Sequence, residues 1–180
     1  MKKSLSSLFL LIALLISTNA LQAQKVIEPK AKQSPFNITT LRVNDTYLKI
    51  TYGQPYKRNR EIFGSLVPYG KIWRTGANEA TEITTNKDIV LGGKRIKAGT
   101  YTLFSIPEKD KWTIIINSDL GQWGAYQYDE SKNVAIFDVP TERIDDTYEA
   151  LTIVIEEAQG GARILVTWDQ TLVRIPVTFN

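Results

Sequence analysis

The sequence predicts an all-β fold, a single antiparallel β-sandwich-like domain with two long loops and at most one or two short helices. Apolar and polar residues alternate with period two along most of residues 34–180, which is the spacing of half-buried strands. Short turns containing glycine, proline or asparagine separate these runs. No stretch shows the spacing of a long amphipathic helix. Many short strands with such turns are typical of a sandwich or barrel.

The alternating runs define the strands one by one. They are expected, in chain order, at residues 38–43, 46–52, 81–85, 89–91, 94–96, 100–106, 112–117, 134–139, 148–156, 162–168 and 171–179. Two-residue connections at Asn44-Asp45 and Asp169-Gln170 allow antiparallel pairing only, because parallel strands need a long crossover. Pro140 is expected to end its strand. Pro176 indicates an edge position, because proline cannot donate to a central ladder.

The N-terminus has the pattern of an export signal. Lys2 and Lys3 precede an apolar run at residues 8–16 and a small-residue exit, which predicts a signal peptide over residues 1–23. The alternative, a membrane anchor, needs about 20 apolar residues and is disfavoured. Residues 24–33 are expected to be a flexible lead-in and residues 34–180 the β domain. The mature protein is then periplasmic or extracellular, with no membrane span.

Composition excludes several classes of function. The chain has no cysteine and no histidine, so it lacks thiolate nucleophiles, imidazole bases and the usual zinc ligands. Removing Lys2 and Lys3 takes the net charge from +3 to +1, which argues against nucleic-acid binding. No cofactor and no metal site is expected. Calcium ligation by Asp119, Asp129 and Glu130 has no supporting spacing. The sequence does not indicate an oligomeric state.

Two long segments interrupt the strands, at residues 53–72 and 118–133. Loops of this length are uncommon in compact domains and are often functional. The alternative is that they fold back and cover an open end of the sandwich. A single helical turn at residues 61–66 is the most that the first segment indicates.

Several motifs resemble those of a known family. They are IFGSLVPYGKIWRTGANEAT at residues 62–81, KAGTYTLF at 97–104, GQWG at 121–124 and YDE at 128–130. Together they resemble the domain of unknown function 2911 family of secreted bacterial proteins. The resemblance implies export and one compact domain, and it implies no activity or catalytic residue.

Residues 73–79 are the first candidate site. Trp73, Arg74, Asn78 and Glu79 combine an aromatic ring, a guanidinium, an amide and a carboxylate around Gly76. Arg74 can hold a carboxylate or phosphate through its planar fork. The alternative is an internal Arg74–Glu79 ion pair that closes the loop onto the sheet. The second of these readings predicts a large stability loss on removing Arg74.

Other candidates lie in the two loops. Arg58 and Arg60 are either part of an anion site or a solvated charge cluster. Trp123 and Tyr126 are either a stacking platform for a ligand or, for Trp123, a plug in the core. Asp129 completes the set of candidate ligand-binding residues. The Trp73–Glu79 segment and the Gly121–Glu130 loop are expected to approach each other in space.

These features favour a non-catalytic module that binds a small molecule or glycan. One alternative is a hydrolase of an envelope or extracellular polymer that uses two carboxylates, since carboxylates are the only acid–base groups left. Another is a structural or assembly protein of the cell envelope that uses the sheet edge near Pro176.

Overall fold

The computed structural model describes residues 30–179, so the predicted signal peptide and most of the predicted lead-in lie outside the described residues. Lys32–Asn180 form one compact unit, which is described here by itself. Within the described part of the chain, no helix is long and apolar enough to cross a membrane.

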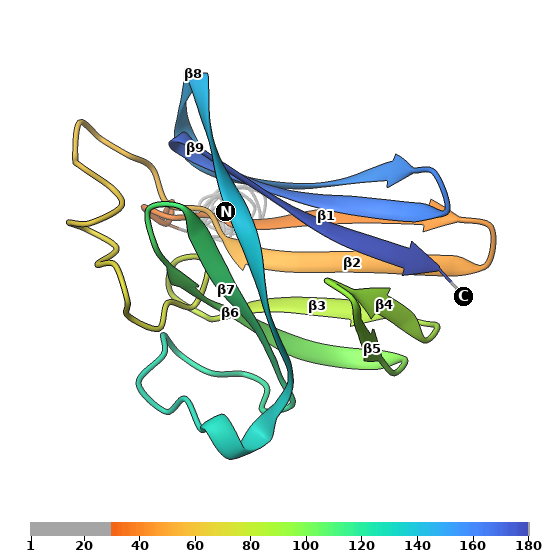
Figure 1. Cartoon of the computed structure of the whole chain (residues 1–180). Coiled ribbons are helices and arrows are strands. Elements are labelled where there is room, and N and C mark those ends of the chain that lie inside the picture. Colours follow the sequence, from red (N-terminus) through yellow and green to blue (C-terminus); the bar gives the residue numbers. More distant parts are fainter. Residues whose placement is uncertain (1–29, 180) are drawn as a thin grey trace, which may run out of the picture. The chain divides into compact units, whose positions relative to one another are not determined.

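The architecture is antiparallel β throughout, which confirms the predicted fold class. The strands are β1 (Phe36–Val43), β2 (Thr46–Gly53), β3 (Thr81–Thr85), β4 (Ile89–Leu91), β5 (Lys94–Ile96), β6 (Gly99–Pro107), β7 (Lys111–Asn117), β8 (Asn133–Ala158) and β9 (Gly161–Phe179). They pair in the order β1-β2-β3-β6-β7-β8-β9-β4-β5 (Figure 1). The described helical structure is one short turn, η2 (Glu130–Lys132).

Two predictions about proline are wrong, for one physical reason. Strand β8 continues through Pro140, and β9 is an inner strand although it contains Pro176. Pro140 pairs with Lys111 at the end of the β7 ladder, and the next residue of β8 pairs with β9. Pro176 lies between the β9 residues that pair with β8 and those that pair with β4. Each proline therefore lies where its strand changes partner, and its missing N–H interrupts neither ladder.

Strand β9 folds back on itself. It has 19 residues and would span about 60 Å if straight. Its two ends are nevertheless neighbours, because the Phe179 N–H donates to the Gly160 carbonyl at 3.2 Å. The reversal lies near Asp169, which has a φ of 54°. The predicted turn at Asp169-Gln170 thus lies inside β9, and Figure 1 shows the blue ribbon reversing there.

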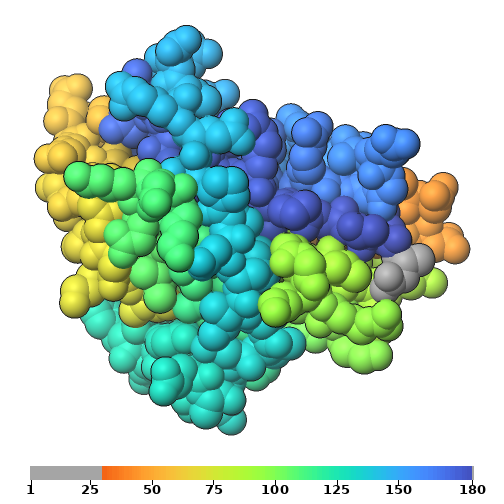
Figure 2. All heavy atoms as spheres, viewed as in Figure 1, coloured from red at the N-terminus to blue at the C-terminus, as the bar shows by residue number. Residues whose placement is uncertain are grey.

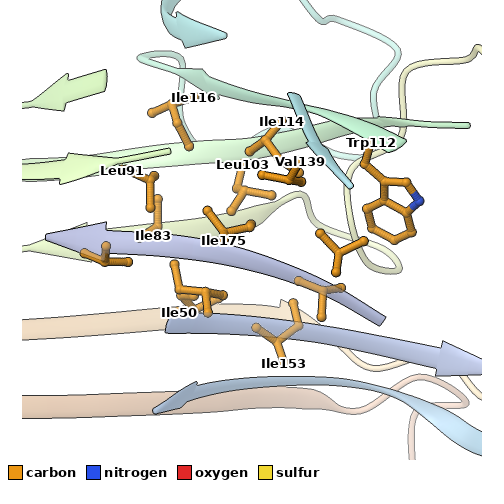
Figure 3. Packing of buried hydrophobic residues seen from close by; sticks show 14 of the residues in the cluster. Ile50, Ile83, Leu91, Leu103, Trp112, Ile114, Ile116, Val139, Ile153 and Ile175 are labelled. Carbon is orange, nitrogen blue, oxygen red and sulfur yellow. The ribbon is translucent and has the colours of Figure 1, made fainter. Parts of the chain in front are cut away.

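The inner faces of the folded sheet enclose one hydrophobic core. Ile50, Ile83 and Ile114 from β2, β3 and β7 meet Ile153 and Ile175 from β8 and β9, as Figure 3 shows. All five side chains are at most 3% exposed. Burial of each stabilises the fold by roughly 1.5–3 kcal/mol. This packing orients the strand ends from which the candidate site is built.

The second long loop covers part of the outer face of the sheet. Phe104 and Ile115 point away from the main core and form a separate cluster with Tyr128 of the loop. The rings of Phe104 and Tyr128 make an edge-on contact with 5.2 Å between centroids. The loop, teal in Figures 1 and 2, therefore covers part of the outer face of β6 and β7.

Candidate functional site

The segment that carries Arg74 is fixed to β6 by hydrogen bonds on both sides. Trp73 exchanges two backbone hydrogen bonds with Ser105, at 2.7 and 2.9 Å. The buried hydroxyls of Thr75 and Ser105 are 2.9 Å apart, and the Trp73 indole N–H donates to the Gly76 carbonyl at 3.1 Å. The backbone on both sides of Arg74 is therefore held in place before any ligand arrives.

This segment also adopts an unfavourable backbone conformation. Thr75 has a φ of 51° and Asn78 a φ of 63°. A β-branched residue in the left-handed region is a true outlier, and such strain is concentrated at binding and catalytic sites. Arg58 and Asn59, in the first long loop, also have positive φ. Four of the six described non-glycine residues with positive φ thus belong to these two segments.

Gly53 allows the segment to approach β2 closely. A Cβ atom at Gly53 would lie 1.9 Å from the carbonyl oxygen of Ala77. The Ala77 N–H in turn donates to the Gly53 carbonyl at 3.0 Å. Only glycine fits at this position, so the end of β2 determines the position of the Arg74 segment.

Aromatic rings form the base of the site. Trp73 stacks on Trp168 with 6.1 Å between centroids and an interplanar angle of 19°. Trp112 and Phe63 contact Trp73 edge-on at 5.7 and 6.1 Å. The prediction that Trp112 and Trp168 are core residues is confirmed, since both are at most 2% exposed. Trp73, predicted as a ligand contact, is also largely buried in this cluster.

The first long loop forms the opposite wall and is tied to β8. The Lys57 N–H donates to the Glu149 carbonyl at 2.6 Å, and the Lys57 ammonium pairs with Asp169 at 2.6 Å. Farther along, the Leu66 and Val67 N–H groups donate to the Glu61 and Ile62 carbonyls. Residues 61–67 therefore form a turn that is not a helix. The suggested helical turn at 61–66 is therefore wrong.

Two arginines on this wall are oriented by main-chain carbonyls. The Arg58 guanidinium donates to the Gln33 carbonyl at 2.8 Å, and its charge lies 5.9 Å from the centre of the Tyr56 ring. The Arg60 guanidinium donates to the carbonyls of Lys57 and Tyr56. Neither arginine forms an ion pair within the described residues.

A cleft of about 270 Å³ lies between the two walls. Three arginines line it together with aromatic, apolar and amide side chains, and no acidic residue does. Its lining is Gln33, Ser34, Pro55, Tyr56, Arg58, Arg60, Leu66, Val67, Trp73, Arg74, Gly76, Ala77, Asn78 and Trp168. The nearby Lys57 pairs with Asp169, and the Glu149 carboxylate accepts from the Arg58 backbone N–H at 2.8 Å, but the lining itself has an excess of positive charge. Such a cleft attracts anions.

Arg74 has no partner among the described residues. Its Nε atom is buried and makes no hydrogen bond, and its guanidinium enters no ion pair. Burial lowers the pKa of Arg74 from its ordinary value, an effect that the Tyr126 phenol opposes. The hypothesis of an internal Arg74–Glu79 ion pair is therefore wrong. A buried donor without a partner is costly, so this side chain points to a missing acceptor.

The Trp73–Glu79 segment and the Gly121–Glu130 loop meet beside Arg74, as predicted. Glu79 and Trp123 form an isolated antiparallel bridge, and the Gly124 N–H donates to the Asn78 carbonyl at 2.9 Å. A second hollow, lined by Lys32, Gln33, Ser34, Asn78 and Trp123, adjoins the cleft and shares three residues with it. Trp123 is 60% exposed, so it is not a plug in the core.

The remaining predicted residues have different positions. Tyr126 is 86% exposed and lies near enough to Arg74 to oppose the lowering of the Arg74 pKa by burial. Asp129 caps η2 by accepting from the Ser131 N–H at 2.9 Å, outside both hollows. The Glu79 side chain is partly buried and lines neither hollow. The structure thus brings Arg58, Arg60, Arg74, Asn78 and Trp123 together around the two hollows.

Sequence reasoning missed Gln33 and Ser34. Gln33 accepts from Arg58, and the Ser34 carbonyl accepts from the Asn78 amide at 3.2 Å. The sequence places Gln33 at the end of the lead-in and Ser34 at the start of the β domain. Neither has a side chain that indicates a site. No group of acidic residues suited to a metal ion occurs within residues 30–179.

A larger hollow of about 440 Å³ lies near the Asn44-Asp45 turn. It is lined by one basic residue, Lys87, and by two acidic residues, Asp45 and Asp88, so its lining has no excess of positive charge. The arginine cleft has the stronger chemical preference for a ligand.

Comparison with known proteins gives a family. The family described as "Protein of unknown function (DUF2911)" matches residues 34–177. That range covers most of the chain, so the protein belongs to this family, as its motifs predicted. No match was found among curated proteins, and none among solved structures.

Proposed function

We propose that this DUF2911 protein is a non-catalytic binding module whose arginine cleft holds the carboxylate or phosphate group of a small ligand. The single observation that carries the proposal is the unpartnered guanidinium of Arg74 in a cleft without acidic lining. An arginine fork binds such anions through two parallel hydrogen bonds.

The rest of the cleft is suited to binding. Main-chain carbonyl groups accept hydrogen bonds from the guanidinium groups of Arg58 and Arg60. These bonds orient the two guanidinium groups without neutralising their positive charge. Trp73 and Trp168 supply an apolar floor. A volume of about 270 Å³ is slightly below the roughly 300–1,000 Å³ of drug-sized pockets, so the bound group is small.

The hydrolase alternative has less support. Hydrolysis by two carboxylates needs acidic groups facing each other across a cleft. No acidic residue among those described lines either hollow at this site. The assembly alternative rested on an exposed edge at Pro176, but the Pro176 carbonyl accepts from Gly92 of the β4–β5 turn at 2.9 Å.

A titration tests the proposal directly. Inorganic phosphate and acetate are titrated into the purified protein and followed by calorimetry and by amide NMR shifts. We expect saturable binding with shifts at residues 74–78, and loss of binding in Arg74→Gln. Arg163→Gln, an exposed arginine of β9 outside the cleft, controls for the loss of one charge. Equal loss in both variants, or no saturation, would contradict the proposal.

We also propose that the module acts outside the cytoplasm. The support is the basic, apolar and small-residue order of residues 1–23. Mass spectrometry of the protein recovered from producing cells should find an N-terminus near Gln24. A mature protein that retains residues 1–23 would contradict export by cleavage.

A further inference from the structure

We infer that the ligand is an acidic oligosaccharide, whose carboxylate binds Arg74 and whose neighbouring sugar stacks on Trp123. The inference rests on the proposed function and extends it from the arginine cleft to the second hollow. Gln33, Ser34 and Asn78 line both spaces, so a ligand longer than one sugar can pass from one to the other without leaving the surface.

Trp123 has the properties of a fixed platform. Its side chain is 60% exposed, which leaves a large apolar face in water, an arrangement that often marks a binding surface. Its backbone is nevertheless paired with Glu79, and the following Gly124 is bonded to Asn78. A rigid aromatic ring loses little entropy on binding. The apolar face of a pyranose ring is the complementary shape.

The polar groups around Trp123 are complementary to sugars that carry a carboxylate. The Asn78 side-chain amide donates to the Ser34 carbonyl, and its Oδ1 atom accepts no hydrogen bond from the described residues, which leaves an acceptor for a hydroxyl between the two hollows. Lys32 lines the second hollow, is exposed, and forms no ion pair among the described residues. Arg74 and Lys32 thus offer one cation for each of two acidic sugars.

An extended acidic peptide is a poorer fit. Peptides that bind in extended form usually pair with free backbone groups of a strand edge. Here the key backbone groups of the walls are already paired: Trp73 with Ser105, Ala77 with Gly53, and Gly124 with Asn78. Side-chain and ring contacts therefore dominate the surface, as they do in recognition of sugars.

The test varies the length and the charge of the ligand and uses three variants of the protein. Galacturonate oligomers of one to four units are titrated into the purified protein, with neutral glucose oligomers of the same lengths and tetraglutamate as comparisons. We expect affinity to rise at least tenfold from the monomer to the trimer. Trp123→Ala should remove that gain while the monomer still binds, and Trp123→Phe should restore part of it. Arg74→Gln should weaken every acidic sugar.

The controls separate this inference from the proposed function. Ile136→Ala removes an exposed apolar side chain of β8 that lines neither hollow, and it should leave all affinities unchanged. If phosphate and the monomer need Arg74 but length brings no gain, the oligosaccharide inference fails and the anion cleft stands. Tetraglutamate binding that depends on Trp123, or neutral oligomers binding equally well, would also overturn the inference. If no anion binds at all, both proposals fail.

Discussion

Glu79 and Trp123 pair backbone to backbone, and this one bridge joins the two longest loops of the domain. Ala80 extends the contact, since its N–H donates to the Gln122 carbonyl at 2.9 Å. The bridge places the exposed ring of Trp123 next to Asn78 and the arginine cleft. The site is therefore built on paired backbone, although its residues come from loops.

Removing Arg74 should leave the fold intact. Arg74 has no internal partner, so Arg74→Gln should change the free energy of unfolding by less than about 0.5 kcal/mol. Chemical denaturation checks this value. Lys57→Gln is the comparison, because it breaks the half-buried Lys57–Asp169 pair and should cost about 1 kcal/mol. An Arg74→Gln loss larger than that of Lys57→Gln would show that Arg74 serves stability.

The sequence predicts the short strands well because their alternation is local. Residues 81–85, 89–91 and 94–96 are strands within the same bounds as predicted. The errors come from partner exchange, which leaves no local signal. Pro140 predicts the end of a strand. Strand β8 nevertheless continues, because Pro140 is the last β8 residue to pair with β7, through Lys111, and the next residue of β8 pairs with β9.

The sequence predicts several residues of the candidate site but not the contacts between them. Arg74 and Asn78 were found because a guanidinium and an amide lie within a few residues of an aromatic ring, and Trp123 because an exposed indole in a loop is unusual. Whether Arg74 pairs with Glu79 depends on side-chain direction, which Thr75 and Asn78 set by adopting positive φ. Their identities do not predict this conformation, because threonine rarely adopts it. Gln33 was missed because its role depends on the Arg58 guanidinium, far along the chain.

Gly53→Ala should damage the site from a distance. The added Cβ would overlap the Ala77 carbonyl oxygen at 1.9 Å, so the segment that carries Arg74 must shift. Overpacking of this kind costs about 1–3 kcal/mol, and phosphate affinity should fall with it. Denaturation and calorimetry measure the two effects. Gly93→Ala is the comparison: it meets no atom within 4 Å but has positive φ, and it should lower stability without changing affinity.

Trp73→Phe should loosen the turn below Arg74. Phenylalanine keeps a ring in the aromatic cluster but lacks the N–H that donates to the Gly76 carbonyl. An unsatisfied buried carbonyl costs about 1–3 kcal/mol. We expect a lower unfolding free energy by denaturation and faster amide exchange at residues 75–78. Unchanged exchange there would mean that Thr75 and Ser105 alone hold the turn.

Acid should loosen the loop that presents Trp123, through Asp129. Hydrogen bonds from Ser131 hold the pKa of the Asp129 carboxyl below its ordinary value. A lowered folded-state pKa means that the cap stabilises η2 above the unfolded pKa of about 3.9, and that this stabilisation is lost as the pH falls through the folded pKa. Limited proteolysis of residues 119–132 with pepsin should therefore accelerate as the pH falls below about 4. Asp129→Ala, which lacks the cap at every pH, should be cleaved faster than the natural protein at the upper end of this range and equally fast at the lower end. An Asp129→Ala loop with the same pH profile as the natural protein would assign the acid sensitivity to another group.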